Sequence, residues 1–251
     1  MQSFTKIALV AATAVAACGL TYTATADHHA KTEDQQMNGQ DALSKLLEGN
    51  KRYVAGEART GDKTPEERAK LAEGQSPYAV IVSCADSRVP PELAFDAGPG
   101  DLFVIRVAGN VVDDFELASI EYAVAVLESP LVMVLGHQSC GAVDAAVKSQ
   151  TEDANYPGHI HDLVEAIRPA VQAAQEGSDD GDLLEASIAK NAQMVVDSLK
   201  DSKPIVGQAV EDGKLTIVPA RYSLETGEVT LIGEDHPAHE GHDSHEGHDH
   251  D

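Results

Sequence analysis

Two clusters of potential metal ligands each follow an apolar run typical of a buried strand. Cys84 follows Ala79-Val80-Ile81-Val82, while His137 and Cys140 follow Leu131-Val132-Met133-Val134-Leu135. In open α/β sheets, ligands bind beyond the carboxyl ends of the strands, so the three side chains are expected to converge there. Two thiolates and one imidazole are a donor set for a catalytic zinc ion that keeps one position open.

The two cysteines have other interpretations. Cysteine is among the residues most often buried, so either one alone could be an ordinary core residue. An N-terminus typical of secretion makes a disulfide between them the competing functional interpretation. A structural disulfide would leave His137 and the nearby Asp86 and Arg88 without a purpose. Zinc ligation therefore ranks first.

Asp86 and Arg88 stand two and four residues after Cys84. An aspartate held by a bidentate arginine stays ionised. It can accept the hydrogen of a zinc-bound hydroxide and so aim the hydroxide at an electrophile. Without Arg88, the same aspartate could occupy the open position of the zinc ion. We therefore predict that Asp86 and Arg88 are catalytic residues.

The combined pattern resembles the β-class carbonic anhydrases. It consists of Cys84-x-Asp86-Ser87-Arg88 and, about fifty residues later, His137-x-x-Cys140-Gly141. The spacing between the two motifs is part of the resemblance. Arg106-Val107-Ala108-Gly109-Asn110 also reads like this family, and the resemblance extends over residues 41–233. It implies a Zn²⁺-dependent lyase that interconverts carbon dioxide and bicarbonate through a zinc-bound hydroxide.

The resemblance also implies a substrate pocket. Phe103, Tyr122 and Gly141 would line it, and Gln75 would come from a neighbouring subunit of a homodimer or a dimer of dimers. By burial tendency alone, Phe103 and Tyr122 would be core residues. One β-class subgroup has an allosteric bicarbonate site that contains tryptophan, and this chain has none. The resemblance therefore favours an open, water-bearing zinc site over one closed by Asp86.

Two further functions stay open at this point. The same scaffold hosts hydrolases of carbon disulfide or carbonyl sulfide, whose motifs are nearly identical. A zinc-buffering protein with an inactive core is the alternative from a different class. Storage needs the ligands only, so the presence of both Asp86 and Arg88 argues against it.

Strand-like and helix-like segments alternate along the chain. The expected strands are 79–82, 102–108 and 131–135, with a terminal hairpin at 215–222 and 228–232, and the expected helices are 41–55, 64–74, 115–127, 140–148, 159–174 and 183–199. This alternation predicts an α/β fold with a mostly parallel central sheet and flanking helices. An N-terminal helical arm and a C-terminal edge hairpin complete it. The strand at 102–108 reads as buried.

Residues 1–26 read as a signal peptide, with an apolar run after Lys6 and Ala24-Thr25-Ala26 as the cleavage site. The product would be exported to the periplasm; lipidation of Cys18 is the alternative. Residues 27–40 are predicted to be a flexible lead-in, and residues 41–233 to be the catalytic domain.

The last segment, residues 234–251, has its own composition. It holds six of the eleven histidines, interleaved with Asp, Glu and Gly. Such a segment is expected to be disordered and to bind extra metal ions, or simply to add solubility. His159 and His161 are expected on the surface. The net charge of −24 argues against binding nucleic acid or an anionic membrane.

Overall fold

The computed structural model describes residues 37–59, 64–177 and 182–233. The predicted signal peptide, most of the lead-in and the histidine-rich tail lie outside the described residues. No helix within the described ranges is long and apolar enough to cross a membrane.

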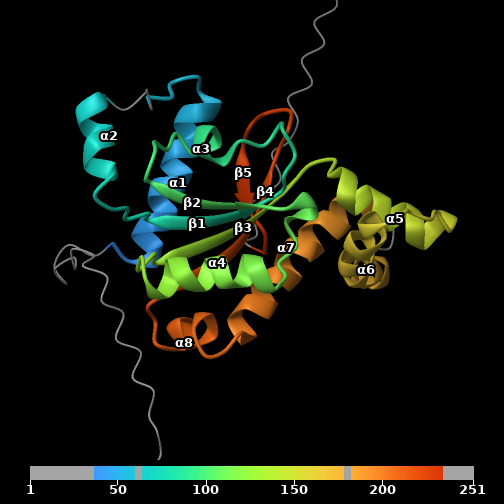
Figure 1. Cartoon of the computed structure of the whole chain (residues 1–251). Coiled ribbons are helices and arrows are strands. Elements are labelled where there is room, and N and C mark those ends of the chain that lie inside the picture. Colours follow the sequence, from blue (N-terminus) through green and yellow to red (C-terminus); the bar gives the residue numbers. More distant parts are fainter. Residues whose placement is uncertain (1–36, 60–63, 178–181, 234–251) are drawn as a thin grey trace, which may run out of the picture.

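The fold is built on a five-stranded sheet with the order β2-β1-β3-β4-β5 (Figure 1). Its strands are β1 (Ala79–Ser83), β2 (Leu102–Arg106), β3 (Leu131–His137), β4 (Thr216–Tyr222) and β5 (Val229–Leu231). The first four strands run parallel, and β5 pairs antiparallel with β4. The predicted α/β fold, with its antiparallel strand pair at one edge, is therefore confirmed.

The helices are α1 (Gly39–Val54), α2 (Pro65–Leu71), α3 (Pro91–Ala94), α4 (Asp114–Ala125), α5 (Gly141–Glu152), α6 (His159–Gly177), α7 (Leu183–Asp201) and α8 (Val206–Glu211). A single 3₁₀ turn, η2 (Ala108–Asn110), follows β2. All the expected helices are present, with small shifts at their ends. The short α3 and α8 were not predicted, because four to six residues are too few to show a helical period.

Strand residues alternate between two apolar layers. Ile81 and Met133 face the layer under α1, whereas Val80, Val82 and Val134 face the layer under α4 and α7. This alternation follows from the two-residue period of a strand. Since both faces are covered, β1 and β3 are buried along their whole length. Figure 1 shows helices on both sides of the sheet.

The expectation that the strand beginning at Leu102 is buried was wrong. Four of the five residues of β2 are only half-buried and the last is exposed. β2 is an edge strand, with β1 as its single partner among the described residues. Periodicity alone cannot tell an edge strand of apolar residues from a central one.

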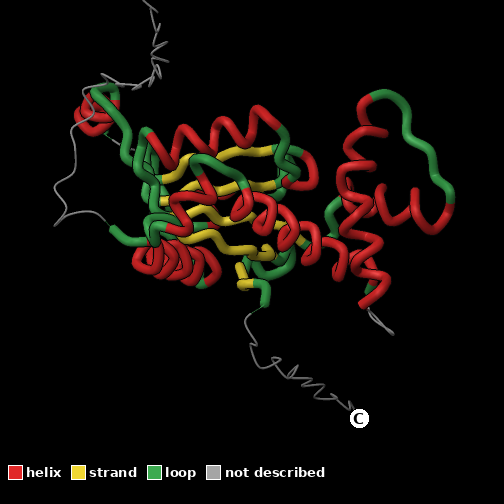
Figure 2. The backbone as a smooth tube through the Cα atoms, turned by 90° about the horizontal axis from the view of Figure 1, so that it is seen from below, coloured by secondary structure: helices red, strands yellow, loops and turns green. Residues whose placement is uncertain are grey.

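A third apolar cluster lies where β1 and β3 end. It brings α5, α6 and the start of α7 together around Cys84 and Cys140. In Figure 2 these helices extend beyond one end of the sheet. The two cysteines therefore sit at the carboxyl edge of the sheet, beneath a helical cover.

Candidate metal centre

Three elements bring the predicted ligands together. Cys84 directly follows β1, His137 is the last residue of β3, and Cys140 is the N-cap of α5. Since β1 and β3 are adjacent and parallel, their ends coincide. The ligand atoms lie within 4.8 Å of one another. The exposed fractions of Cys84, His137 and Cys140 are 5%, 0% and 1%, so all three ligands are buried.

The two cysteines are free thiols, with their Sγ atoms 4.0 Å apart. A disulfide would bring the sulfurs to about 2.05 Å, so the disulfide interpretation is wrong for this structure. Two sulfurs bound to one tetrahedral zinc ion at about 2.3 Å lie about 3.8 Å apart. The observed separation is close to the one that zinc requires.

His137 is oriented for metal binding. Its Nδ1 lies 2.9 Å from the carbonyl oxygen of Gln138 and donates to it. The lone pair is then on Nε2, which is buried and has no hydrogen-bond partner among the described residues. A buried polar atom without a partner is costly, and a metal ion between His137 and the two thiols would satisfy it. The donor set fits zinc.

The two thiols share one hydrogen bond, which shifts their pKa values in opposite directions. The hydrogen bond with Cys140 lowers the pKa of Cys84 to about 4, and the same bond, with burial, raises the pKa of Cys140. The N–H of Gly109, 3.3 Å from Cys84 Sγ, adds to the lowering. Metal ions bind thiolates and not thiols, so a divalent cation at this position favours loss of the protons of both cysteines.

Asp86 lies beside this cluster, held by Arg88. The Nε of Arg88 donates to Oδ1 at 2.9 Å, and one terminal nitrogen donates to Oδ2 at 2.6 Å. These bonds hold the pKa of Asp86 well below its usual range. Oδ2 lies 3.9 Å from Nε2 of His137. An ionised carboxylate thus borders the position that a metal ion would take.

Arg106 fixes the segment that carries both Cys84 and Asp86. Its Nε donates to the carbonyl oxygen of Cys84 at 3.0 Å, and a terminal nitrogen donates to that of Asp86 at 2.5 Å. Arg106 is the last residue of β2 and pairs with Ser83 in the register. The end of the edge strand therefore holds the loop that follows β1.

The structure does not bring all the predicted pocket residues to the metal ligands within one chain. Gly141 follows Cys140 directly, with open space where a Cβ would lie. Phe103 pairs with Val80, four residues before Cys84, so roughly 13 Å of strand separates them. Tyr122 contacts Phe103, with ring centroids 6.4 Å apart. Gln75 is exposed and precedes β1, at the opposite edge of the sheet.

Several groups around the site were not predicted from the sequence. The N–H of Gly109 and the carbonyl of Gln138 act through the backbone, which side-chain chemistry does not reveal. Gly109 adopts a left-handed φ of 67°. Its signals in the sequence were its position after an apolar run and its place in the family-like stretch from Arg106 to Asn110. The expected surface position of His159 and His161 is confirmed, since both are exposed.

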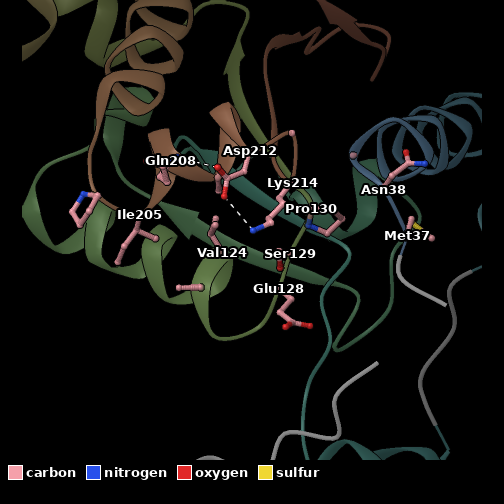
Figure 3. Close-up of a pocket in the computed structure, with 15 residues that line it drawn as sticks. Met37, Asn38, Val124, Glu128, Ser129, Pro130, Ile205, Gln208, Asp212 and Lys214 are labelled. Atoms are coloured by element: carbon pink, nitrogen blue, oxygen red, sulfur yellow. Dashed lines mark hydrogen bonds and ion pairs between the residues drawn. The ribbon is translucent and has the colours of Figure 1, made fainter. Parts of the chain in front are cut away.

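A cavity of about 610 Å³ lies near the amino ends of the strands, away from the metal ligands. Figure 3 shows its lining, which includes Met37, Val124, Gln208, Asp212 and Lys214. Two of the charges there are paired with each other: Asp212 accepts from Lys214 at 3.1 Å and also from Gln208 at 2.9 Å. We assign this cavity no role in the chemistry.

The sequence of this chain is similar to those of known proteins. The family described as "Carbonic anhydrase" matches residues 79–229. Carbonic anhydrase 2 of Mycobacterium tuberculosis is 41% identical over 196 residues, which cover 78% of this chain and 92% of the relative. The carbonic anhydrase of Mycolicibacterium smegmatis is 40% identical over 191 residues, with coverages of 76% and 91%.

Solved structures of β-carbonic anhydrases are similar to this chain in fold. The β-carbonic anhydrase CcaA superposes with a TM-score of 0.60 and 29% identity, covering 75% of this chain and 94% of that one. The Coccomyxa β-carbonic anhydrase, solved with acetazolamide, gives a TM-score of 0.58 and 28% identity, with coverages of 76% and 86%.

A parallel sheet with two thiols and one imidazole at its carboxyl edge defines a zinc lyase of the β class. The chain belongs to the carbonic anhydrase family. Its reaction is the reversible hydration of carbon dioxide, and its zinc ligands are Cys84, His137 and Cys140. The predicted family, reaction and cofactor are confirmed.

Proposed function

We propose that Asp86 and Arg88 orient the nucleophile for carbon dioxide hydration in an open zinc site. A zinc ion held by the three ligands supplies an activated water molecule. The observation that carries the proposal is the Asp86–Arg88 pair, with Oδ2 of Asp86 only 3.9 Å from Nε2 of His137. Arg88 keeps the carboxylate ionised, so Asp86 can accept a hydrogen from the nucleophile and direct its lone pair at carbon dioxide.

The pairing also supports an open fourth position. Both oxygens of Asp86 are engaged by Arg88, and Oδ1 further accepts from the backbone N–H of Arg88 at 2.9 Å. Turning this carboxylate toward the ligands would break these bonds. The test is to measure carbon dioxide hydration and zinc content together on the purified protein without residues 236–251, so that only the core zinc is counted. One zinc per chain without hydration activity would contradict the proposed roles.

The zinc-buffering alternative predicts ligands without an orienting pair. The paired Asp86 and Arg88 beside the ligands favour catalysis. Assays with carbon disulfide and carbonyl sulfide on the same preparation test the remaining alternative. Faster turnover of either compound than of carbon dioxide would reassign the substrate.

We further infer that a second copy of the chain completes the substrate pocket. Phe103, Tyr122 and Gln75 lie away from the metal ligands of their own chain. Tyr122 and Phe115 are large apolar residues of α4 with exposed fractions of 45% and 87%. A homodimer or a dimer of dimers would cover them and bring Gln75 and the aromatic pair to the neighbouring zinc site.

We also propose that residues 1–26 direct export to the periplasm. This proposal rests on their apolar run and the Ala-Thr-Ala site that follows it.

Residues 234–251 are proposed to capture metal ions for the active site. This proposal rests on their six histidines, which are interleaved with carboxylates. Deletion of residues 236–251 should leave activity unchanged in zinc-rich medium and reduce it in chelator-treated medium. Equal activity in both media would rule out delivery by the tail.

A further inference from the structure

One face of α7 is directed toward the loops of both thiolate ligands. Glu185, Ile188 and Asn191 are spaced three residues apart and therefore share a helix face. Ile188 packs against the end of β3, where a Cβ at Gly136 would lie 3.2 Å from its Cγ2. The polar residues on either side of Ile188 each make a hydrogen bond to a ligand loop.

Asn191 acts on the Cys84 side. It is 4% exposed, and its Nδ2 donates to the carbonyl oxygen of Gly109 at 2.8 Å. The N–H of the same glycine points at Cys84 Sγ. A Cβ at Gly109 would lie 2.7 Å from Cδ1 of Ile167, and the φ of 67° favours glycine here. Hydrogen bonds to a ligand orient it and tune its donor strength.

Glu185 acts on the Cys140 side. Its Oε1 accepts from the N–H of Ser139 at 3.0 Å, and its Oε2 accepts from Arg221 of β4 at 2.7 Å. Ser139 lies between His137 and Cys140 and adopts a φ of 52°. L-residues rarely adopt this conformation, so the turn that joins two ligands depends on outside contacts. Glu185 supplies one.

We propose that Asn191 and Glu185 are positioning residues of the zinc site, through which α7 sets the separation and orientation of the two thiolates. Neither residue touches a ligand atom; Asn191 acts through Gly109 and Glu185 through Ser139. The inference rests on the zinc ligands and is independent of the roles proposed for Asp86 and Arg88.

A purely structural role would look different. If Asn191 only satisfied a buried carbonyl, its removal would lower the free energy of unfolding and leave metal binding in the folded protein unchanged. Metal release and the ligand spectrum therefore separate the two roles. Cobalt gives an absorption band specific to thiolate ligation. Because no cysteine lies beyond Cys140, cobalt on the tail histidines would not contribute to that band.

The experiment compares cobalt-loaded full-length variants N191A, E185A and E185Q with the wild type. Release into excess chelator is followed by the decay of the thiolate band, after a melting curve shows that each variant is folded. N191A and E185A should release cobalt roughly 10–100-fold faster and shift the band. E185Q keeps an acceptor for Ser139 but loses the ion pair with Arg221, so its release should be intermediate.

Ser187 provides the matched control. It is a fully buried residue of the same helix, and its hydroxyl has no hydrogen-bond partner among the described residues. S187A should behave as the wild type. Wild-type release and spectra in folded N191A and E185A would overturn the proposal, as would equally fast release from S187A. If N191A or E185A fails to fold, N191S, whose hydroxyl is too short to reach Gly109, and E185Q decide the outcome in the same assay.

Discussion

At the scale of single residues, Cys140 has two functions. Its sulfur is a zinc ligand, and its backbone begins α5 as the N-cap, without a capping hydrogen bond from the side chain. Serine is a favourable N-cap residue, so Cys140→Ser removes the sulfur without weakening the start of the helix. The substitution therefore isolates metal binding from helix stability.

We expect Cys140→Ser to lose both the zinc of the core and the activity. The remaining Cys84 and His137 are too few ligands for tight tetrahedral binding. Zinc content should be measured by elemental analysis in a form without residues 236–251, because the tail histidines would mask the loss. The same form with Cys140 intact is the control. Full zinc and full rate in the variant would place the site elsewhere.

In the form without residues 236–251, we expect Asp86→Asn to retain one zinc per chain and to lose about two to four orders of magnitude in hydration rate, the range for a positioned acid–base group. The hydrogen bonds from Arg88 hold the pKa of Asp86 below its usual range, so the carboxylate is ionised at neutral pH. Acidification from pH 7 to pH 5 does not protonate it. An activity loss in that range must come from another group.

Asp144→Asn is the matched control for this experiment. Asp144 is a half-buried aspartate of α5 that pairs with Lys148 at 2.7 Å. Its substitution should leave the rate unchanged. A near-normal rate in Asp86→Asn, measured by stopped flow with zinc content alongside, would exclude the orienting role.

At the scale of elements, Asn50 connects α1 to two distant segments. Its Nδ2 donates to the carbonyl oxygens of Ala94 at the end of α3 and of Gly227 before β5. Its Oδ1 accepts from the N–H of Val229 in β5 at 2.8 Å. The side chain is buried, with 3% exposed. One amide thus holds the N-terminal helix against the edge hairpin.

We expect Asn50→Ala to lower the free energy of unfolding by about 2–3 kcal/mol, since it leaves buried backbone groups without partners. The hydrogen-bond partners of Asn50 are in Ala94, Gly227 and Val229 and include no zinc ligand, so zinc content should not change. Lys51→Ala, an exposed neighbour in the same helix, is the control and should unfold as the wild type in urea. Equal midpoints for the two variants would show that these bonds contribute nothing.

The sequence predicted the features that depend on residue types along the chain and missed those that depend on contacts between distant residues. Apolar runs that end in Cys84 and His137 were enough to predict the strands and the zinc ligands. Both buried strands and metal ligands can be recognised from the types of side chain along the sequence. The exposed edge position of β2 was not predictable, since it depends on which strands pair. Asn191 and Glu185 were missed because their contacts with the ligand loops join residues far apart in the chain.

At the scale of the whole molecule, three expected pocket residues lie away from the zinc ligands of their own chain: Gln75, Phe103 and Tyr122. Gln75 lies before β1, whereas Cys84 lies after it. If a second copy supplies Gln75, each zinc site is made of two chains. An active site built in this way has a property that a one-chain site lacks: two different defects can compensate in a mixed dimer.

We expect Cys140→Ser and Gln75→Ala subunits to restore activity when they are co-expressed. The first has no zinc but an intact Gln75, and the second has zinc but no Gln75. In a mixed dimer, the zinc site of the second subunit receives Gln75 from the first. Two tagged copies, purified in tandem, isolate this species for the hydration assay. The mixed dimer should exceed both parent homodimers in rate. A rate no higher than that of the Gln75→Ala homodimer would mean that Gln75 does not act across an interface.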